Sequence, residues 1–210
     1  MLSKTEICNI ALGRAQHTQR VANIDTENSL AAEMCRQYWK VSIESVLEGI
    51  SPSFAQRIER LALLPNQINK QYDNVYILPD DCLAPLKVVT ADYRASRKYN
   101  ASHEIDFIKG QSDDGKNKTI QTDIDNAYLL YTTRNVDTHM FDPTFVTALT
   151  FLMGSNLANS VKKDTDLANQ LAGTYMRLIS KSAAIDKNAQ SSEINYAYNF
   201  ANPSLDERLN

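Results

Sequence analysis

A glycine-containing segment in the middle of the chain comes close to a phosphate-binding loop. Residues 110–117 have the sequence Gly-Gln-Ser-Asp-Asp-Gly-Lys-Asn, whereas the phosphate-binding pattern ends in Gly-Lys followed by Ser or Thr. Asn117 lacks the hydroxyl group that would hold magnesium, and Asp113 and Asp114 would repel phosphates. Residues 118–122 have a strand pattern, so no helix N-terminus would face the anion. We therefore expect a hairpin turn rather than a nucleotide site.

The histidines offer a second kind of chemistry, metal binding. His17, His103 and His139 are far apart, and the sequence has neither a His-Glu-x-x-His nor a Cys-x-x-Cys pattern. Asp137, His139 and Asp142 could gather on one ion, but metal sites need three or four convergent ligands. Asp142 is also the expected cap of a helix. We interpret this segment as a polar linker.

Two acidic pairs, Asp80–Asp81 and Asp123–Asp125, have the residue types of a glycosidase site. A glycosidase needs its two carboxylates to face each other across a substrate cleft, which adjacency in sequence cannot provide. Aspartate also favours turns, because its side chain bonds to nearby backbone. We interpret both pairs as turn residues. We expect no catalytic residue, no cofactor and no metal, and we predict that the chain is not an enzyme.

The first third of the chain has the apolar spacing of helices. Ser3 and Glu6 form a capping-box pattern, which predicts a helix that ends within residues 13–16. Apolar residues at helical spacing predict a second, longer helix over residues 25–49 and a short third helix over residues 54–64.

The middle of the chain has β-branched and aromatic runs separated by Pro, Asp and Gly. We expect strands over residues 74–79, 86–90, 104–109, 118–122 and 127–132. Asp114-Gly115 and Asp125-Asn126 are the expected turns between the last three. Together these strands predict a small antiparallel meander from about residue 75 to residue 133.

The helical pattern returns late in the chain. Asp142 followed by Pro143 predicts an N-cap with proline at the first helical position. Gly154 and its small neighbours would allow another helix to approach closely. A last long helix begins at Asp164.

These segments predict an α+β fold class: mainly an α-helical bundle with an inserted small antiparallel β-region and an extended C-terminal arm. The expected parts are N-terminal helices over 1–74, the antiparallel β-region over 75–133, a C-terminal helix pair over 134–190 and the extended arm over 191–210.

The C-terminal arm alternates large apolar residues with small or polar ones, which is a strand pattern. Two interpretations remain open: a strand that closes the protein's own sheet, or an arm that binds the surface of a partner. Under the second interpretation the arm docks on its partner through Ile194, Tyr196, Tyr198, Phe200, Leu205 and Leu209.

Composition excludes several classes of protein. Apolar residues make up 43% of the 210 residues and charged residues 22%, as in an ordinary globular protein, and the net charge is −3. A protein that grips nucleic acid by its phosphates has a basic face, which this balance does not indicate. The three cysteines, at positions 8, 35 and 82, indicate free thiols rather than a disulfide framework. Phe145–Ala158, the most apolar stretch, is too short to span a bilayer.

Five segments follow one another along the chain: Ile7–Gly13, Asp25–Leu47, Ser51–Ala55, Tyr76–Leu83 and Phe141–Phe145. In this order they resemble the tail tubular protein A, or head-to-tail adaptor, family of short-tailed phages. The resemblance covers most of the chain from residue 3 to about residue 185. The chain departs from the family in one respect, because the third segment lacks the family's tryptophan.

The resemblance implies a virion structural protein with no membrane partner. It implies a homo-oligomeric ring, commonly of twelve copies, between the portal protein and the tail nozzle protein in the neck of the virion. Such a ring is assembled in the host cytoplasm, and DNA passes through its lumen during ejection as a non-specific cargo. Our hypothesis is that the helices build the ring and the arm docks on the portal. The alternative function is a phage-tail-associated glycan or cell-wall hydrolase.

Overall fold

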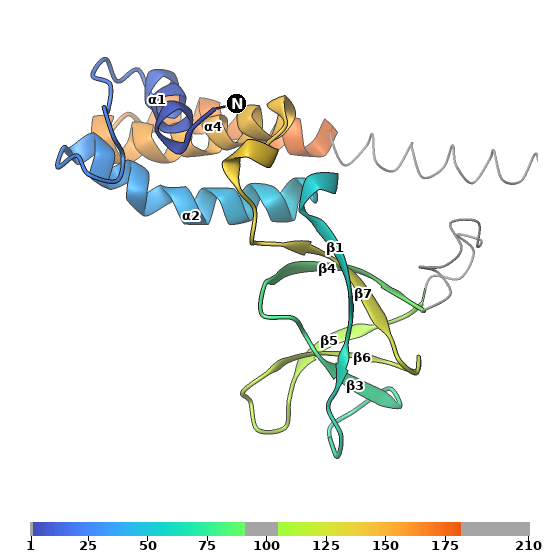
Figure 1. Ribbon diagram of the computed structural model, residues 1–210. Coiled ribbons are helices and arrows are strands. Elements are labelled where there is room, and N and C mark those ends of the chain that lie inside the picture. Colours follow the sequence, from blue (N-terminus) through green and yellow to red (C-terminus); the bar gives the residue numbers. More distant parts are fainter. Residues whose placement is uncertain (1, 91–104, 182–210) are drawn as a thin grey trace, which may run out of the picture.

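The structure, a computed structural model, describes residues 2–90 and 105–181. Helices form one layer and strands the other (Figure 1). The helical layer contains α1 (Lys4–Arg14), α2 (Leu30–Ile50) and α4 (Pro143–Leu157). A π-helical turn, η3 (Ala158–Lys162), follows α4 and leads to a C-terminal helix described over residues 165–181. None of the described helices has the length and apolarity needed to cross a bilayer.

Local capping signals set where two of these helices begin. The Ser3 hydroxyl accepts from the Glu6 amide at 3.2 Å and the Glu6 carboxylate accepts from the Ser3 amide at 2.7 Å, so the predicted capping box is confirmed. The Asp142 carboxylate accepts from the Phe145 amide at 2.7 Å, which confirms the predicted start of α4. The predicted start of α2 at residue 25 is wrong, because Ser29 caps that helix and residues 15–29 form a loop.

The strands form two antiparallel sheets. Sheet A has the order β1 (Gln56–Arg60), β7 (Tyr128–Thr133), β4 (Cys82–Val89). Sheet B has the order β2 (Ala62–Leu63), β3 (Asn74–Ile77), β6 (Lys118–Thr122), β5 (Ile108–Gln111). The chain changes sheet four times: between β1 and β2, between β3 and β4, between β4 and β5, and between β6 and β7. The predicted meander is therefore wrong, although strands occur close to all five expected positions.

The expected mainly helical bundle is also wrong. The described residues form an α+β fold in which seven strands make two antiparallel sheets. The segment responsible is 54–64, where the spacing of Phe54, Ile58 and Leu61 fits a helix. Only Ser53–Ala55 is helical, as a single 3-10 turn (η1), and the rest forms β1 and β2. Pairing with the distant β7 and β3 outweighs this weak local preference.

Each layer has its own apolar core. The helical core includes Ile7, Leu12, Leu47, Phe145, Leu149, Met153 and Leu157. The strand core includes Tyr76, Val88, Ile120, Leu129 and Tyr131. An aromatic cluster lies where the layers join: the Phe54 ring is 5.8 Å from the Phe141 ring and 5.3 Å from the ring of Phe145 in α4, centroid to centroid.

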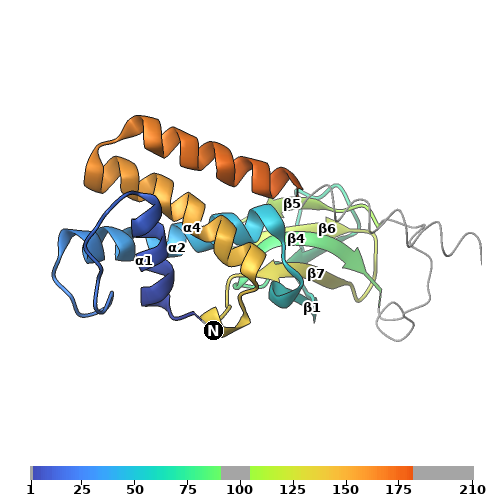
Figure 2. The same ribbon diagram turned by 90° about the horizontal axis from the view of Figure 1, so that it is seen from above.

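The close helix approach predicted at Gly154 is confirmed. A Cβ atom on Gly154 would lie 3.0 Å from Arg14 Cβ, 3.3 Å from the Ala11 carbonyl oxygen and 3.5 Å from Leu171 Cδ1. Figure 2 shows the C-terminal helix lying beside α4, and it shows α1 crossing α4. Glycine at this crossing lets α1, α4 and the C-terminal helix pack at close range.

Candidate interaction surface

Residues 110–117 form the turn of the β5–β6 hairpin. Gly115 has a φ of +70°, a conformation that glycine adopts at little cost. The Asp114 carboxylate accepts from the Lys116 amide at 3.1 Å, so it serves the turn itself. Strand β6 follows, rather than a helix. The predicted hairpin is confirmed.

The acidic pairs lie in turns, as predicted. The Asp123 carboxylate accepts from the Asp73 amide, and the Asp125 carboxylate accepts from the Asn74 side chain, each at 3.0 Å. Asp80 and Asp81 form the turn before β4. The structure gives the carboxylates of Asp81, Asp123 and Asp125 hydrogen-bond partners within the fold.

The histidine segment is not assembled into a metal site in the part of the chain that the structure describes. Within 2–90 and 105–181, no group of three or more His, Cys, Asp or Glu side chains could hold a metal ion. Asp142 serves as the cap of α4 and His139 lies in the short helix η2 (Thr138–Met140). His103 is outside the described residues.

The six residues predicted to dock on a partner also lie outside the described residues. They are Ile194, Tyr196, Tyr198, Phe200, Leu205 and Leu209. Two other surfaces of the described chain have the features of interaction sites, and neither was predicted from the sequence.

The first surface is the loop between α1 and α2, residues 15–29. Loops of this length without secondary structure are uncommon and are often functional. Asn9 on α1 holds the loop through two reciprocal bonds, since its side chain donates to the Val21 carbonyl at 2.9 Å and accepts from the Val21 amide at 2.8 Å. Val21 and Ile24 are buried in the helical core. The loop therefore has a fixed conformation while many of its other residues face solvent.

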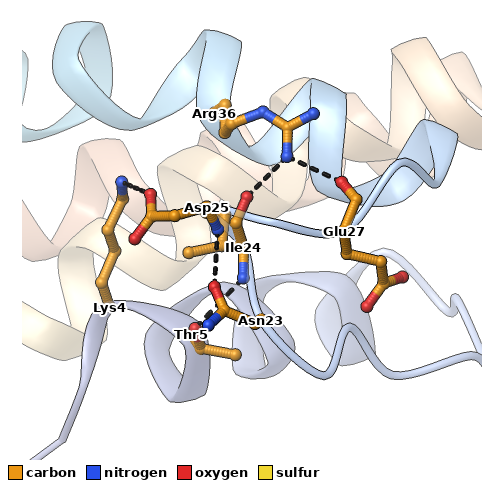
Figure 3. Close-up of polar contacts among 7 residues, drawn as sticks. All are labelled: Lys4, Thr5, Asn23, Ile24, Asp25, Glu27 and Arg36. Atoms are coloured by element: carbon orange, nitrogen blue, oxygen red, sulfur yellow. Dashed lines mark hydrogen bonds and ion pairs between the residues drawn. The ribbon is translucent and has the colours of Figure 1, made fainter.

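Helix α2 holds the same loop from its other side (Figure 3). Arg36 donates from one guanidinium nitrogen to the carbonyls of Ile24 at 2.6 Å and Glu27 at 2.9 Å. Lys4 forms an ion pair with Asp25 at 2.6 Å, but the Asp25 side chain is 63% exposed. Exposed ion pairs contribute about 0–1 kcal/mol, whereas hydrogen bonds from a charged group contribute about 1.5–3 kcal/mol. Arg36 is therefore the main polar anchor of the loop in Figure 3.

Glu27 stabilises the end of the loop. Its carboxylate accepts from the Ser29 hydroxyl at 2.6 Å and from the Ala22 amide at 2.7 Å. The hydrogen bond from Ser29 is the largest cause that holds the pKa of Glu27 below its ordinary value, and the bond from Ala22 is the second. The carboxylate is charged at neutral pH and keeps the last loop residues in place next to the cap of α2.

The second surface is formed by β1 and β2, residues 56–63, which we call the free edge. The unpaired side differs between the two strands, because the Leu61 amide bonds towards β7 and the Leu64 amide bonds towards β3. Both strands are the outermost members of their sheets, and every residue of β1 and β2 is exposed. Among the described residues no strand pairs with the outer side of either one. Such an edge carries unpaired backbone donors and acceptors and is a template for an added strand.

A polar cluster at the start of β4 holds the free edge to sheet A. The Asp81 carboxylate accepts from the Thr133 hydroxyl at 2.7 Å and from the Tyr131 hydroxyl at 2.9 Å, and it pairs with Arg57 at 3.1 Å. Burial raises the pKa of Asp81, but the bonds from Thr133 and Tyr131 and the charge of Arg57 outweigh it and hold the pKa below its usual value. One ionised carboxylate thus joins β1, β4 and β7.

The loop after β2, residues 64–73, extends the free edge; we call it the tip loop. Figure 1 shows β1 running from the helices towards the far end of the strand layer, where this loop lies. Asp113 of the β5–β6 turn accepts from the Ile68 amide at 2.6 Å and from the Asn69 amide at 3.2 Å. The backbone of Ile68 is therefore held, yet its side chain is 87% exposed.

A shallow depression lies beside the free edge. Its volume is about 520 Å³. Leu61, Ala62, Leu63 and Tyr76 supply apolar atoms, and the polar residues that line it are Arg60, Asn74, Asp125 and Asn126. Leu63 is 54% exposed. The depression offers space for an apolar side chain beside Leu63, next to the residues of β3 that pair with β2.

Sequence patterns did not predict these two surfaces. The apolar spacing of residues 54–64 predicted a helix, so the strands that form the free edge were not expected. Ile68 had one available signal, a single apolar residue within a polar stretch rich in Asn, Gln and Asp, but scattered apolar surface residues are common.

Comparisons with models of known protein families and with curated proteins gave no match for this chain. Its fold and surfaces define an α+β protein with a fixed interhelical loop and an unpaired strand edge.

Proposed function

We propose that this protein is a structural head-to-tail adaptor of a phage virion. Copies of the chain form a ring between the portal protein and the tail nozzle protein, and the genome passes through the ring during ejection. The basis of the proposal is the ordered resemblance of five segments to the adaptor family of short-tailed phages.

One structural observation supports this proposal above the others. Two of the five segments, Ser51–Ala55 and Phe141–Phe145, are far apart in sequence but pack together through Phe54, Phe141 and Phe145. The Phe141 and Phe145 rings are 4.6 Å apart, and Phe54 meets Phe145 edge-on at 87°. The segment that lacks the family's tryptophan thus has an aromatic residue, Phe54, in packing contact. These two segments therefore pack together where α4 begins and where the chain enters β1.

The exposed features of the molecule suit an assembly protein. Loop 15–29 and the tip loop are both held by hydrogen bonds while they present side chains to solvent. Fixed loops bind with little loss of conformational entropy, which favours stable contacts between subunits. The free edge adds backbone groups that can pair with another chain.

The alternative, a tail-associated hydrolase, gains no support from a particular observation. A hydrolase of glycans would need two carboxylates on opposite sides of a cleft. In the described residues, the acidic pairs singled out from the sequence occupy turns, and Asp81, Asp123 and Asp125 accept hydrogen bonds from their surroundings.

Mass photometry of the purified chain mixed with the portal protein of the same genome tests the proposal. We expect a discrete complex whose mass exceeds that of the portal ring by a whole number of 23.6 kDa steps, which also counts the subunits. A zymogram on cell-wall glycan, run on the same preparation, tests the alternative. A well-folded portal ring that leaves the chain unbound would overturn the adaptor proposal, whatever the zymogram shows.

A further inference from the structure

We propose that Ile68, on the tip loop of one copy of this chain, inserts into the depression beside Leu63 on a second copy. The contact joins two different patches, so repeated copies assemble head to tail. That this assembly closes into a ring, rather than continuing as an open chain, rests on the proposed function.

Ile68 is an apolar anchor on a fixed backbone. Among the described residues it is the most exposed large apolar side chain, at 87%. The Asp113 carboxylate accepts from the Ile68 amide at 2.6 Å and from the Asn69 side chain at 3.0 Å. The Gln67 side chain accepts in turn from the Asp113 amide at 2.8 Å. A side chain presented on a fixed backbone loses little conformational entropy when it binds, and removing its apolar surface from water favours association.

The depression is also formed before any partner binds. Tyr76, which lines it, is 3% exposed. Two hydrogen bonds hold the polar rim: Arg60 donates to Asn126 at 2.6 Å, and Asn74 donates to Asp125 at 3.0 Å. The volume of about 520 Å³ exceeds that of one isoleucine side chain. An apolar centre surrounded by a polar rim is typical of protein interfaces.

The anchor and the depression lie at different strands of sheet B. Strand β3 separates β2 from β6, which places β2 and β6 about 10 Å apart. The depression lies at β2, whereas the tip loop crosses β6, where the Gln121 side chain accepts from the Gln71 amide at 2.8 Å. At 87% exposure, Ile68 does not occupy the depression of its own chain. An anchor and a pocket at different places on one molecule make a head-to-tail contact, which closes into a ring when the rotation permits.

The two patches have complementary charges. Lys70 and Asp113 lie beside Ile68, one positive and one negative. The rim of the depression likewise carries Asp125 and Arg60. Opposite charges face each other when Lys70 meets Asp125, and like charges meet when the loop is turned the other way. Charges of this kind contribute to the orientation of a contact more than to its affinity.

A contact centred on one anchor is weak, with a dissociation constant of about 1 mM. Copies held side by side on a portal ring would meet at an effective concentration in the millimolar range. The full-length chain is therefore tested both alone at a concentration equal to this dissociation constant and mixed with the portal.

Isotope-resolved photocrosslinking tests the contact. An aliphatic diazirine amino acid replaces Ile68, and ¹⁵N-labelled and unlabelled chains are mixed in equal amounts. We expect crosslinked peptides that join position 68 to residues 60–63 or 74–76 of a chain with the other isotope label. The same amino acid at Val41, which is 62% exposed on α2, is the control for random encounters and is expected to give few such products.

Each outcome decides the matter. Products that avoid the depression, products that join only chains of one label, or no products between copies in either sample would overturn the proposal. A portal complex without these products would still support the adaptor function. Inter-copy products at the depression without any portal complex would support the contact and count against the adaptor function.

A substitution in the depression provides a second readout. Leu63→Asp is expected to reduce the yield of inter-copy product about tenfold, the loss expected when an apolar contact of the anchor is replaced by a charge. Leu30→Asp is the matched control, because Leu30 on α2 is 58% exposed and Leu63 is 54% exposed. Equal yields from the two variants would contradict the proposal.

Charge reversal tests the orientation of the contact. Lys70→Glu and Asp125→Lys should each lower the yield about threefold, since an exposed ion pair contributes little. A chain that carries both substitutions brings opposite charges together again, so its yield should return towards that of the chain without them. A double variant with a yield as low as the single variants would show that the two residues do not meet.

Discussion

At the scale of single residues, Gly154 shows how one missing side chain sets the distance between three helices. A Cβ there would come within 3.5 Å of atoms from α1 and the C-terminal helix, including the Ala11 backbone carbonyl. Backbone cannot move aside as a flexible side chain can. The close packing of this crossing therefore depends on glycine.

Gly154→Ala is expected to lower the free energy of unfolding by about 1 kcal/mol, because overpacking costs about 1–3 kcal/mol while alanine recovers up to about 1 kcal/mol of helix propensity. Gly173→Ala is the control, since a Cβ on Gly173 meets nothing within 4 Å and should stabilise the helix slightly. Urea denaturation of both variants measures the difference. Equal stabilisation by the two substitutions would show that the crossing is not tight.

Asp81 is the second residue whose role is set by its partners. Asp81→Asn removes the ion pair with Arg57 and weakens bonds from Thr133 and Tyr131, so it should cost about 1–3 kcal/mol at pH 7. The folded-state pKa of Asp81 is lowered, so its contribution is complete above the unfolded pKa of about 3.9 and is lost as pH falls through the lower folded value. The stability difference from the unsubstituted chain should therefore shrink below about pH 4.

Urea unfolding at pH 7, 4 and 3 measures this dependence. Asp80→Asn is a suitable control, because Asp80 is the exposed neighbour in the same turn. A stability difference that is the same at all three pH values would mean that the charge of Asp81 has no part in holding β1.

At the scale of elements, the loop between α1 and α2 is held by hydrogen bonds rather than by secondary structure. Asn9 of α1 and Arg36 of α2 bond to its backbone from opposite ends. Removing either anchor should release the loop while the helices remain folded, since their core contacts lie elsewhere.

Arg36→Gln removes the charged donor to Ile24 and Glu27. The loss of about 1.5–3 kcal/mol of local stability corresponds to roughly 10–100-fold faster amide hydrogen exchange across residues 21–27. Exchange in β6 and β7 should be unchanged. Lys40→Gln, an exposed charge removed from the same helix, is the control, and equal acceleration by both variants would argue against a specific anchor.

At the scale of the whole molecule, the layers and the charge define what the protein can contact. Each layer has its own core, and Phe54 and Phe141, in the segments that connect the layers, pack against Phe145 in the first turn of α4. The net charge of −3 gives the chain no overall attraction for phosphate backbones. This suits the proposed ring, through which DNA must pass without being held.

The chain alone is therefore expected to show no binding of double-stranded DNA at 0.15 M salt, up to about 10 μM protein. Non-specific DNA-binding proteins reach dissociation constants of about 10⁻⁴–10⁻⁶ M by neutralising phosphates. Fluorescence anisotropy of a labelled duplex measures this, with a basic DNA-binding protein as the positive control. Binding that weakens steeply with added salt would reveal a basic face and contradict the proposed passive lumen.

The sequence by itself determined the features that depend on neighbours a few positions away. Ser3 with Glu6, Asp142 with Pro143, and Gly115 in its turn all act within three or four residues, so their effects could be predicted without knowing the fold. The strand at residues 118–122 was likewise predicted from its own composition and occurs as β6.

Only the tertiary structure decided the features that depend on distant partners. Residues 56–63 became strands because β7 and β3 pair with them, and residues 25–29 became loop because Asn9, Arg36 and the helical core hold the segment around them. The interaction surfaces arise from the same long-range contacts. An unpaired edge is a property of strand order, and strand order follows from which distant segments bury their side chains together rather than from any local pattern.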